Sequence, residues 1–171
     1  VRAEFETSPW NAYQGPEGAE TLVVASGLSA TYAQEALNAL GLDERAGLLK
    51  LGTTWPLPAK AILERLVPAK TVCFLEEVDP FVEDAIKVIY AENVDRAGRV
   101  RFCGKNEGFV AGPDGAGVGE MNTDVALSAL ARLFDLEPGG GDPVSEDLLA
   151  RAQDLLVPRE LSFCQGCPHR S

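Results

Sequence analysis

The chain has 171 residues, of which 46% are hydrophobic and 24% charged, ordinary values for one globular domain. Its net charge of −11 at pH 7 excludes the basic surface that nucleic acids or an anionic membrane would need, and no apolar run approaches the ~18 residues of a membrane span. Composition therefore predicts a soluble domain with an acidic surface, with no nucleic-acid partner and no membrane partner.

Residues 1–19 are rich in the turn-forming residues Ser, Pro, Gly and Asn, and we expect them to be a linker. The pattern changes at Glu20, where short apolar runs begin to alternate with helical stripes of apolar residues. The apolar runs predict strands at residues 21–25, 47–51, 72–75 and 100–103. Charged residues in the last run predict that it lies at an edge of the sheet.

An amphipathic helix is expected after each of these strands. The expected helices begin near Ser29, Ala59, Asp79 and Asn122. Ser29 is a candidate cap of the first helix, and Gly41 is its candidate stop. Asp79 is the expected cap of the third helix, with Pro80 at the first helical position. Strands that alternate with helices in this way predict a three-layer α/β/α sandwich with a mostly parallel sheet.

The domain boundaries follow from the same pattern. The α/β domain is predicted over residues 20–135, and a linker with one short amphipathic helix over residues 136–160. The chain begins without a methionine and stops shortly after a cysteine motif that starts at Cys164. We therefore expect it to be a middle piece of a longer protein.

The four cysteines fall into two pairs of different character. Cys73 and Cys103 lie inside apolar runs and are expected to be buried thiols, and the absence of a disulfide pattern predicts a cytoplasmic chain. Cys164 and Cys167 form a Cys-x-x-Cys, which can hold zinc or an iron–sulfur cluster or form a redox disulfide. A zinc or cluster site needs about four ligands, so this motif is incomplete within the chain.

Three carboxylates, Glu76, Glu77 and Asp79, follow the predicted strand at 72–75. They lie at the edge where open α/β sheets bind ligands, and paired carboxylates can act as acid and base. The alternative is structural: Asp79 caps the next helix, one Glu faces solvent and the other binds nearby backbone. We favour the structural interpretation because caps of this type are common.

The remaining motifs argue against an autonomous enzyme. The Gly-rich residues 104–120 predict a connecting loop, because the G-x-G-x-G run at 115–119 differs from the dinucleotide-binding spacing and the early βα turn has one glycine, Gly27. His169 is the only histidine of the chain. The predicted domain therefore has no histidine general base and no nucleophile–histidine pair, although a carboxylate or lysine could still transfer protons.

Four stretches together carry a family resemblance: LVVASGLSATY at 22–32, LKLGTTWPLP at 49–58, FLEEVDPFVE at 74–83 and CQGCPHR at 164–170. In this order they resemble the alpha subunit of indolepyruvate ferredoxin oxidoreductases, a family of the 2-oxoacid:ferredoxin oxidoreductase superfamily. The resemblance covers residues 20–171 and implies the fold of a transketolase C-terminal-like domain. It also implies that residues 161–171 begin a truncated thiamine-diphosphate-binding domain.

The family's reaction is oxidative decarboxylation of aryl 2-oxoacids to acyl-CoA, with reduction of ferredoxin. The resemblance implies thiamine diphosphate, magnesium, iron–sulfur clusters and CoA for the parent enzyme. It implies other domains of the same subunit, a second (beta) subunit and ferredoxin as partners. The cofactor-binding candidates are Cys164, Gly166, Cys167, Pro168 and His169, of which Cys164 and Cys167 are candidate metal ligands. The candidate domain or subunit interface is Glu76, Glu77, Asp79 and Pro80.

Three functions remain open at this point. The first is a non-catalytic structural and assembly domain of such an oxidoreductase, for which the isolated chain should be inactive and hold no cofactor. The second is a stand-alone α/β module that binds a small anion or a nucleotide, and the third is a pure interaction scaffold. The sequence does not select the 2-oxoacid substrate or the oligomeric state.

Overall fold

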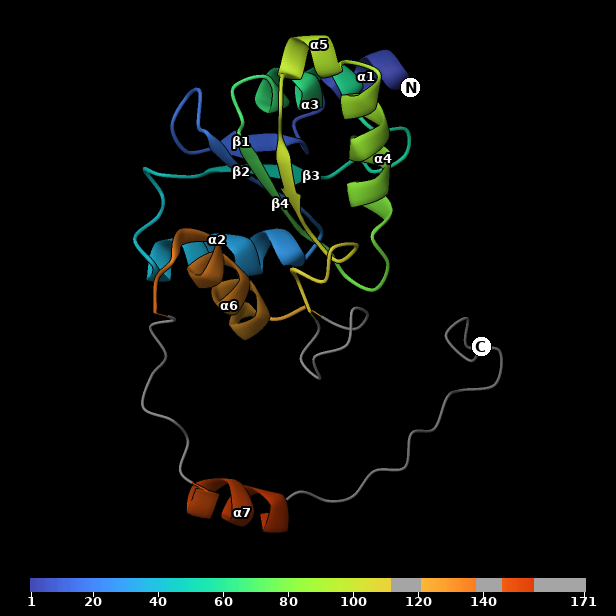
Figure 1. The fold of residues 1–171 in the computed structure, drawn as a ribbon. Helices are drawn as coiled ribbons and strands as arrows, with labels where there is room; N and C mark the ends of the chain where they lie inside the picture. Colours follow the sequence, from blue (N-terminus) through green and yellow to red (C-terminus); the bar gives the residue numbers. More distant parts are fainter. Residues whose placement is uncertain (112–120, 138–145, 156–171) are drawn as a thin grey trace, which may run out of the picture. The chain divides into compact units, whose positions relative to one another are not determined.

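A five-stranded sheet forms the centre of residues 1–139 in the computed structural model, which describes residues 1–111, 121–137 and 146–155 (Figure 1). In spatial order the strands are β1 (Ala12–Gln14), β3 (Gly47–Leu51), β2 (Thr21–Ser26), β4 (Thr71–Leu75) and β5 (Arg101–Cys103). β2 to β5 run parallel, whereas β1 pairs antiparallel with β3. All four predicted strands are confirmed, and β5 is at the sheet edge as expected.

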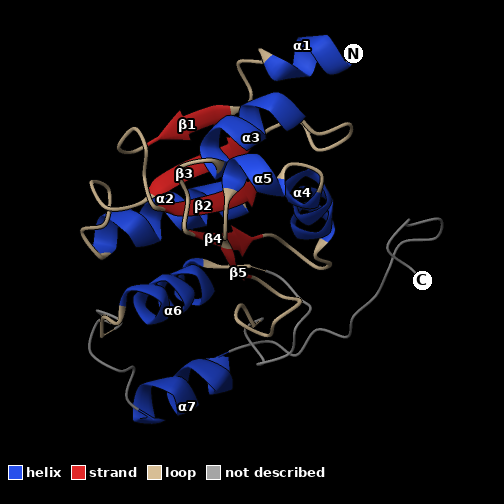
Figure 2. Cartoon of the chain, turned by 45° about the horizontal axis from the view of Figure 1, so that its top comes forward, coloured by secondary structure: helices blue, strands red, loops and turns tan. Residues whose placement is uncertain are grey.

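Helices cover both faces of this sheet (Figure 2). On one face lie α2 (Ser29–Ala39) and α6 (Thr123–Phe134), and on the other α3 (Ala59–Leu66) and α4 (Phe81–Ala91). Successive side chains of a strand point to opposite faces, so Val23 of β2 packs in the first core and Val24 in the second. Both cores are apolar and buried, which confirms the predicted three-layer α/β/α sandwich.

Three further helices complete the described chain. α1 (Arg2–Glu6) precedes β1, and α5 (Val94–Ala97) connects α4 to β5. α7 (Glu146–Leu155) is the expected short helix after the domain, and it belongs to a separate unit, residues 140–171. Among the helices of the described ranges, none combines the length and apolar character that a bilayer crossing requires.

Residues 1–19 are not the linker that their composition predicts. β1 joins the sheet, with Tyr13 opposite Leu49 of β3. The Asn11 carboxamide secures this segment, since its oxygen accepts hydrogen bonds from the backbone N–H groups of Gly52 at 2.9 Å and Thr53 at 3.0 Å. The turn-forming residues of this segment therefore belong to one edge of the domain and not to a linker.

The end of α2 and the start of α6 lie where the sequence predicts them, whereas the predicted cap of α2 is wrong. Gly41, at φ +63°, ends α2 as predicted, and the N–H of Leu42 bonds the carbonyl of Leu37 across it at 2.9 Å. Asn122 caps α6 by accepting a hydrogen bond from the N–H of Val125 at 2.9 Å. Ser29 is not the cap of α2. It is the first helical residue, its side chain is fully buried, and its hydroxyl has no partner among the described residues.

Candidate functional site

The candidate site lies at the carboxyl edge of the parallel strands, beside the neighbouring strands β2 and β4. After β2 the chain adds β3 on one side, and then crosses to the other side to add β4. Such a reversal creates the crevice in which open α/β sheets bind ligands. A pocket of about 250 Å³ occupies this position. It is lined by Ser26, Gly27 and Leu28 at the end of β2, by Thr54 after β3, and by Glu76, Glu77, Asp79, Phe81 and Val82 between β4 and the first turn of α4.

Glu76 links the end of β4 to the start of α4. The residue is 5% exposed, and its carboxylate accepts two hydrogen bonds, from the N–H of Val82 at 2.8 Å and from the N–H of Glu83 at 2.9 Å. These are free amides of the first helical turn, so Glu76 and not the predicted Asp79 caps α4. Burial raises the pKa of Glu76 above its usual range, and the two amide donors offset part of that rise.

The loop between Glu76 and α4 is held in an unusual backbone conformation. Val78 has φ +58°, which a β-branched residue adopts at a cost of about 1–3 kcal/mol. The buried Lys105 stabilises it, because its Nζ donates a hydrogen bond to the Val78 carbonyl at 2.7 Å. Burial lowers the pKa of Lys105, an effect that the nearby carboxylates of Glu76 and Asp79 oppose. The loop is therefore fixed from both ends.

Glu83 extends this polar network beneath the loop that follows β5. The side chain is fully buried, and its Oε2 accepts a hydrogen bond from the N–H of Lys105 at 2.9 Å. Its Oε1 accepts a hydrogen bond from Nζ of Lys87 at 2.7 Å. A Cβ on Gly104 would lie 2.2 Å from Oε2, so only glycine lets the backbone approach this carboxylate so closely.

Lys87 connects the buried network to the surface. Its Nζ forms ion pairs with both Glu83 and the more exposed Glu107. Burial acts to lower the pKa of Lys87, but the hydrogen bonds to Glu107 and Glu83 outweigh it and raise the pKa overall. The same contact lowers the pKa of Glu107 despite its partial burial. Both groups are thus kept in their charged forms, as a structural ion pair requires.

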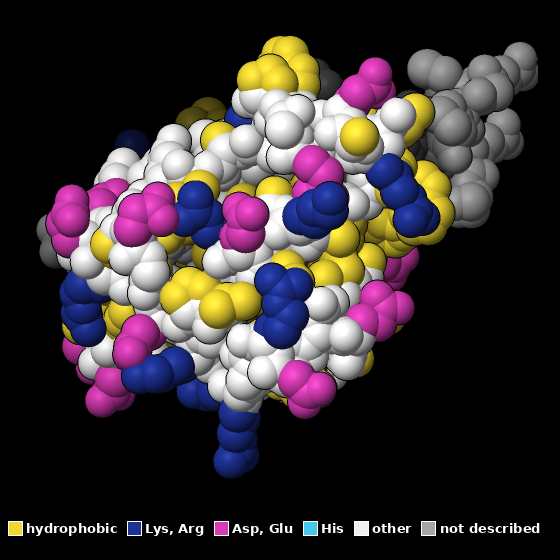
Figure 3. Space-filling model, turned by 90° about the horizontal axis from the view of Figure 1, so that it is seen from above, with side chains coloured by type: hydrophobic (Ala, Val, Ile, Leu, Met, Phe, Trp, Pro, Cys, Tyr) yellow, Lys and Arg dark blue, Asp and Glu magenta, His cyan; other side chains and the backbone are white. Residues whose placement is uncertain are grey.

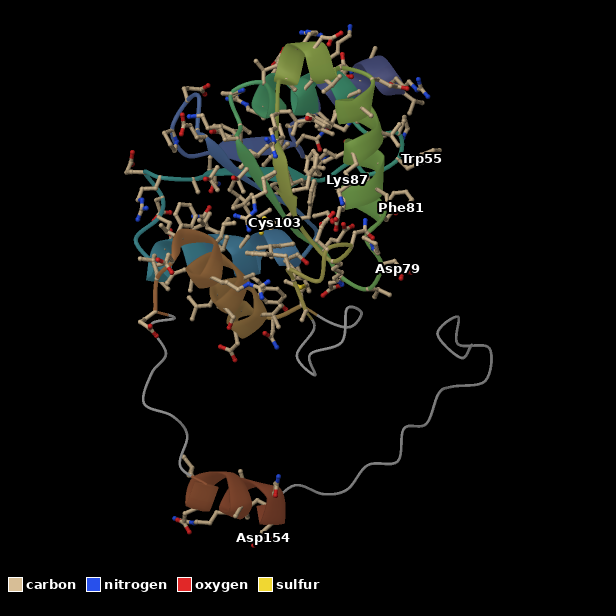
Figure 4. All side chains as sticks on the ribbon, in the orientation of Figure 1. Trp55, Asp79, Phe81, Lys87, Cys103 and Asp154 are labelled. Carbon is tan, nitrogen blue, oxygen red and sulfur yellow. The ribbon has the colours of Figure 1, made fainter. Side chains whose placement is uncertain are left out.

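The exposed part of the site combines carboxylates with aromatic rings. Glu77 and Asp79 face solvent, as the structural interpretation expected of one glutamate, while Pro80 is half-buried before α4. Trp55 is 76% exposed and Phe81 53% exposed, and their rings meet edge to face with centroids 6.3 Å apart. Figure 4 shows both side chains on the same side of the molecule as Asp79.

The structure therefore separates the four predicted interface residues into two roles. Glu77 and Asp79 are available for contact, whereas Glu76 is engaged inside the domain. The site residues predicted from the sequence do not include Glu83, Lys105 or the Trp55–Phe81 contact. One signal was present for Glu83, since it lies three residues before Ile86 on the otherwise apolar face of α4.

The other predicted site residues lie outside the described residues. These are Cys164, Gly166, Cys167, Pro168 and His169, together with residues 112–120 of the Gly-rich loop. In the part of the chain that the structure describes, no group of three His, Cys, Asp or Glu side chains could hold a metal ion. Cys73 and Cys103 are buried free thiols, as predicted, and they are register partners on β4 and β5.

The strand order and the two helical layers define an α/β domain with a mostly parallel sheet. No family model matches the sequence. A solved structure described as "Split gene transketolase, inactive beta4 tetramer" aligns over 70% of this chain and 40% of its own, with a TM-score of 0.48 and 17% sequence identity.

Sequence comparison identifies a particular relative. The chain is 34% identical over 171 residues to the indolepyruvate oxidoreductase subunit IorA of Pyrococcus horikoshii, covering 99% of this chain and 24% of that subunit. It is 35% identical to the IorA of Pyrococcus abyssi, and 32% identical to that of Archaeoglobus fulgidus, with 99% of this chain and about a quarter of each subunit covered. The chain is therefore homologous to a segment that makes up about a quarter of IorA, which confirms the resemblance found in the sequence.

Proposed function

We propose that this chain is a non-catalytic structural and assembly domain of a thiamine-diphosphate-dependent indolepyruvate:ferredoxin oxidoreductase. The observation that carries the proposal is the homology over almost the whole chain to a segment of IorA. The complete enzyme would convert an aryl 2-oxoacid and CoA into an acyl-CoA and carbon dioxide, and pass the electrons to ferredoxin. Its partners would be the other domains of the subunit, a beta subunit and ferredoxin.

The chemistry of the described residues supports a structural role. Glu76 and Glu83, the buried carboxylates, are occupied by backbone amides and by Lys87 rather than left free for proton transfer. The described residues offer no set of ligands for magnesium or for an iron–sulfur cluster. In the proposed enzyme, thiamine diphosphate and the clusters would be held by other parts of the subunit. We propose that residues 161–171, with Cys164 and Cys167, begin the thiamine-diphosphate-binding domain.

The alternative of a stand-alone module for an anion or a nucleotide is less compatible with the site. The pocket at the switch point is lined by the carboxylates of Glu76, Glu77 and Asp79. A phosphate group placed there would meet like charge, whereas phosphate sites present glycine-rich backbone amides or basic side chains. The acidic lining therefore argues against this second function.

An activity comparison tests the proposal. The chain alone and the complete subunit, each with the beta subunit, are assayed with indolepyruvate, CoA and ferredoxin or an artificial electron acceptor. We expect turnover only from the complete subunit. Turnover by the chain alone would contradict the non-catalytic role, and a parent reading frame without a thiamine-diphosphate-binding sequence would contradict the family assignment of the function.

A further inference from the structure

Four exposed apolar side chains extend from the carboxyl edge of the sheet along α4. Leu28 and Phe81 line the same pocket, Phe81 contacts Trp55, and Trp55 lines a second, open pocket of about 620 Å³ together with Val88. Each of these four side chains is more than half exposed. We call Leu28, Trp55, Phe81 and Val88 the Trp55 face. It lies beside the strained loop at Val78, which is held by hydrogen bonds of Lys105 and Glu76.

This arrangement differs from ordinary exposure of single apolar residues. Scattered exposed valines, such as Val67 and Val94 in this chain, are normal on a soluble domain. A contiguous apolar patch with a tryptophan and a phenylalanine in contact is typical of an interface centre, where aromatic residues supply most of the binding energy. The hydrogen bonds that hold the loop beneath Phe81 also reduce the conformational entropy that this segment would lose when a partner docks.

The charges around the Trp55 face indicate the kind of partner. On the side of Leu28 and Phe81, Glu77 and Asp79 are exposed. The cation near them, Lys105, is buried and donates its hydrogen bond to the Val78 carbonyl. On the side of Val88 the charges balance, with Arg2 and Lys60 beside Glu6 and Glu92. The face seen in Figure 3, which includes α5, likewise mixes basic and acidic side chains.

A second copy of the chain is a poor occupant, because it would bring acidic side chains against Glu77 and Asp79 in a molecule whose net charge is −11. A matching surface needs an apolar centre and at least one Lys or Arg opposite these carboxylates. In the IorA relatives this segment makes up only about a quarter of the subunit, so the rest of the subunit can provide a surface of this kind.

We propose that the Trp55 face is the docking surface for another domain of the same longer subunit, through an apolar patch bordered by Lys or Arg. The inference rests on the proposed function, because it takes its partner from the remainder of an IorA-like subunit. It assigns Trp55 and Phe81 to the centre of the contact, and Glu77 and Asp79 to its border. Of the interface residues predicted from sequence, only the border residues fall in this surface as exposed groups.

Hydroxyl-radical footprinting read by mass spectrometry tests this assignment. The modification rates of Trp55 and Phe81 are compared between the 171-residue chain and the complete subunit. We expect both rates to fall several-fold in the complete subunit. Val94 on α5, which is 45% exposed at the opposite edge of the sheet, should change little. Equal rates at Trp55 in the two proteins, or an equal fall at Val94, would overturn the proposal.

Substitutions in the complete subunit identify the chemistry of the contact. Phe81→Asp should return the modification rate of Trp55 toward that of the isolated chain, whereas the matched variant Val94→Asp should not. Reversing both border charges, with Glu77→Lys and Asp79→Lys, should also raise the rate at Trp55, and Glu64→Lys on the exposed face of α3 should not. A charge reversal that leaves Trp55 protected would contradict the proposal that the partner places Lys or Arg opposite Glu77 and Asp79.

Two further measurements distinguish a failure of the docking proposal from a failure of the proposed function. Sedimentation of the isolated chain tests the second copy as occupant, because a dimer that protects Trp55 would replace the proposed partner. Indolepyruvate-dependent reduction of ferredoxin is measured on the same complete subunit. Activity with an unprotected Trp55 would refute the docking face alone, and a protected Trp55 in a protein without this activity would refute the proposed function alone.

Discussion

Replacing Glu83 by alanine should be one of the most destabilising single changes at the carboxyl edge. Glu83 is fully buried, and its carboxylate bonds the N–H of Lys105 and Nζ of Lys87. Removing one partner of a buried ion pair costs about 3–5 kcal/mol, and a buried amide left without an acceptor costs about 1–3 kcal/mol. Lys87 retains its contact with Glu107, so we expect a loss near the lower limit, about 3 kcal/mol.

Urea unfolding followed by circular dichroism measures this loss as a change in the free energy of unfolding. Glu83→Gln keeps the shape and one acceptor but removes the charge, so it should fall between the wild type and Glu83→Ala. Glu64→Ala, at an exposed position of α3, is the matched control and should stay within about 0.5 kcal/mol of the wild type. A Glu83→Ala variant as stable as Glu64→Ala would refute the reasoning.

A double-mutant cycle tests the geometry of the same contact. Gly104→Ala places a methyl group against the Glu83 carboxylate and should destabilise the domain. The combined Gly104→Ala/Glu83→Ala variant should lose less than the sum of the two single changes, because the truncated side chain no longer meets the methyl group. Strictly additive losses would mean that the two residues are not in contact.

Other predictions concern the cap of α4 and the buried thiols. Glu76→Ala should lower the free energy of unfolding by about 1 kcal/mol through loss of the cap, whereas the exposed Glu77→Ala should leave it within about 0.5 kcal/mol in the same urea assay. Burial raises the pKa of Glu76, so the folded chain binds more protons than the unfolded chain above pH ~4.3. The stability of the wild type relative to Glu76→Gln should therefore fall as pH rises through the raised pKa, and parallel pH profiles would contradict this. Burial also raises the pKa of the Cys73 and Cys103 thiols, so iodoacetamide should label them only after urea unfolding. Mass spectrometry measures the labelling, and rapid labelling of the native chain would contradict their burial.

Much of the fold was predictable because its signals are local. Burial within a single element produces the apolar runs of β2, β3 and β4 and the apolar helical stripe of α6. Because strands and helices alternate along the chain, these signals imply a parallel sheet covered by helices. The end of α2 was likewise visible, since Gly41 adopts a positive φ that other residues avoid. The family resemblance rested on motif order, which is also a property of the linear sequence.

Tertiary structure decided the features that depend on pairing across the chain. β1 has three residues in a turn-rich segment and no periodic signal of its own, so its place in the sheet comes from β3 and from the Asn11 contacts. Asp79 has the sequence position of a cap, yet the buried Glu76 is the residue that reaches the amides of α4. Trp55 and Phe81 are 26 residues apart in the sequence, and only the convergence of loops at the carboxyl edge of the sheet brings their rings together.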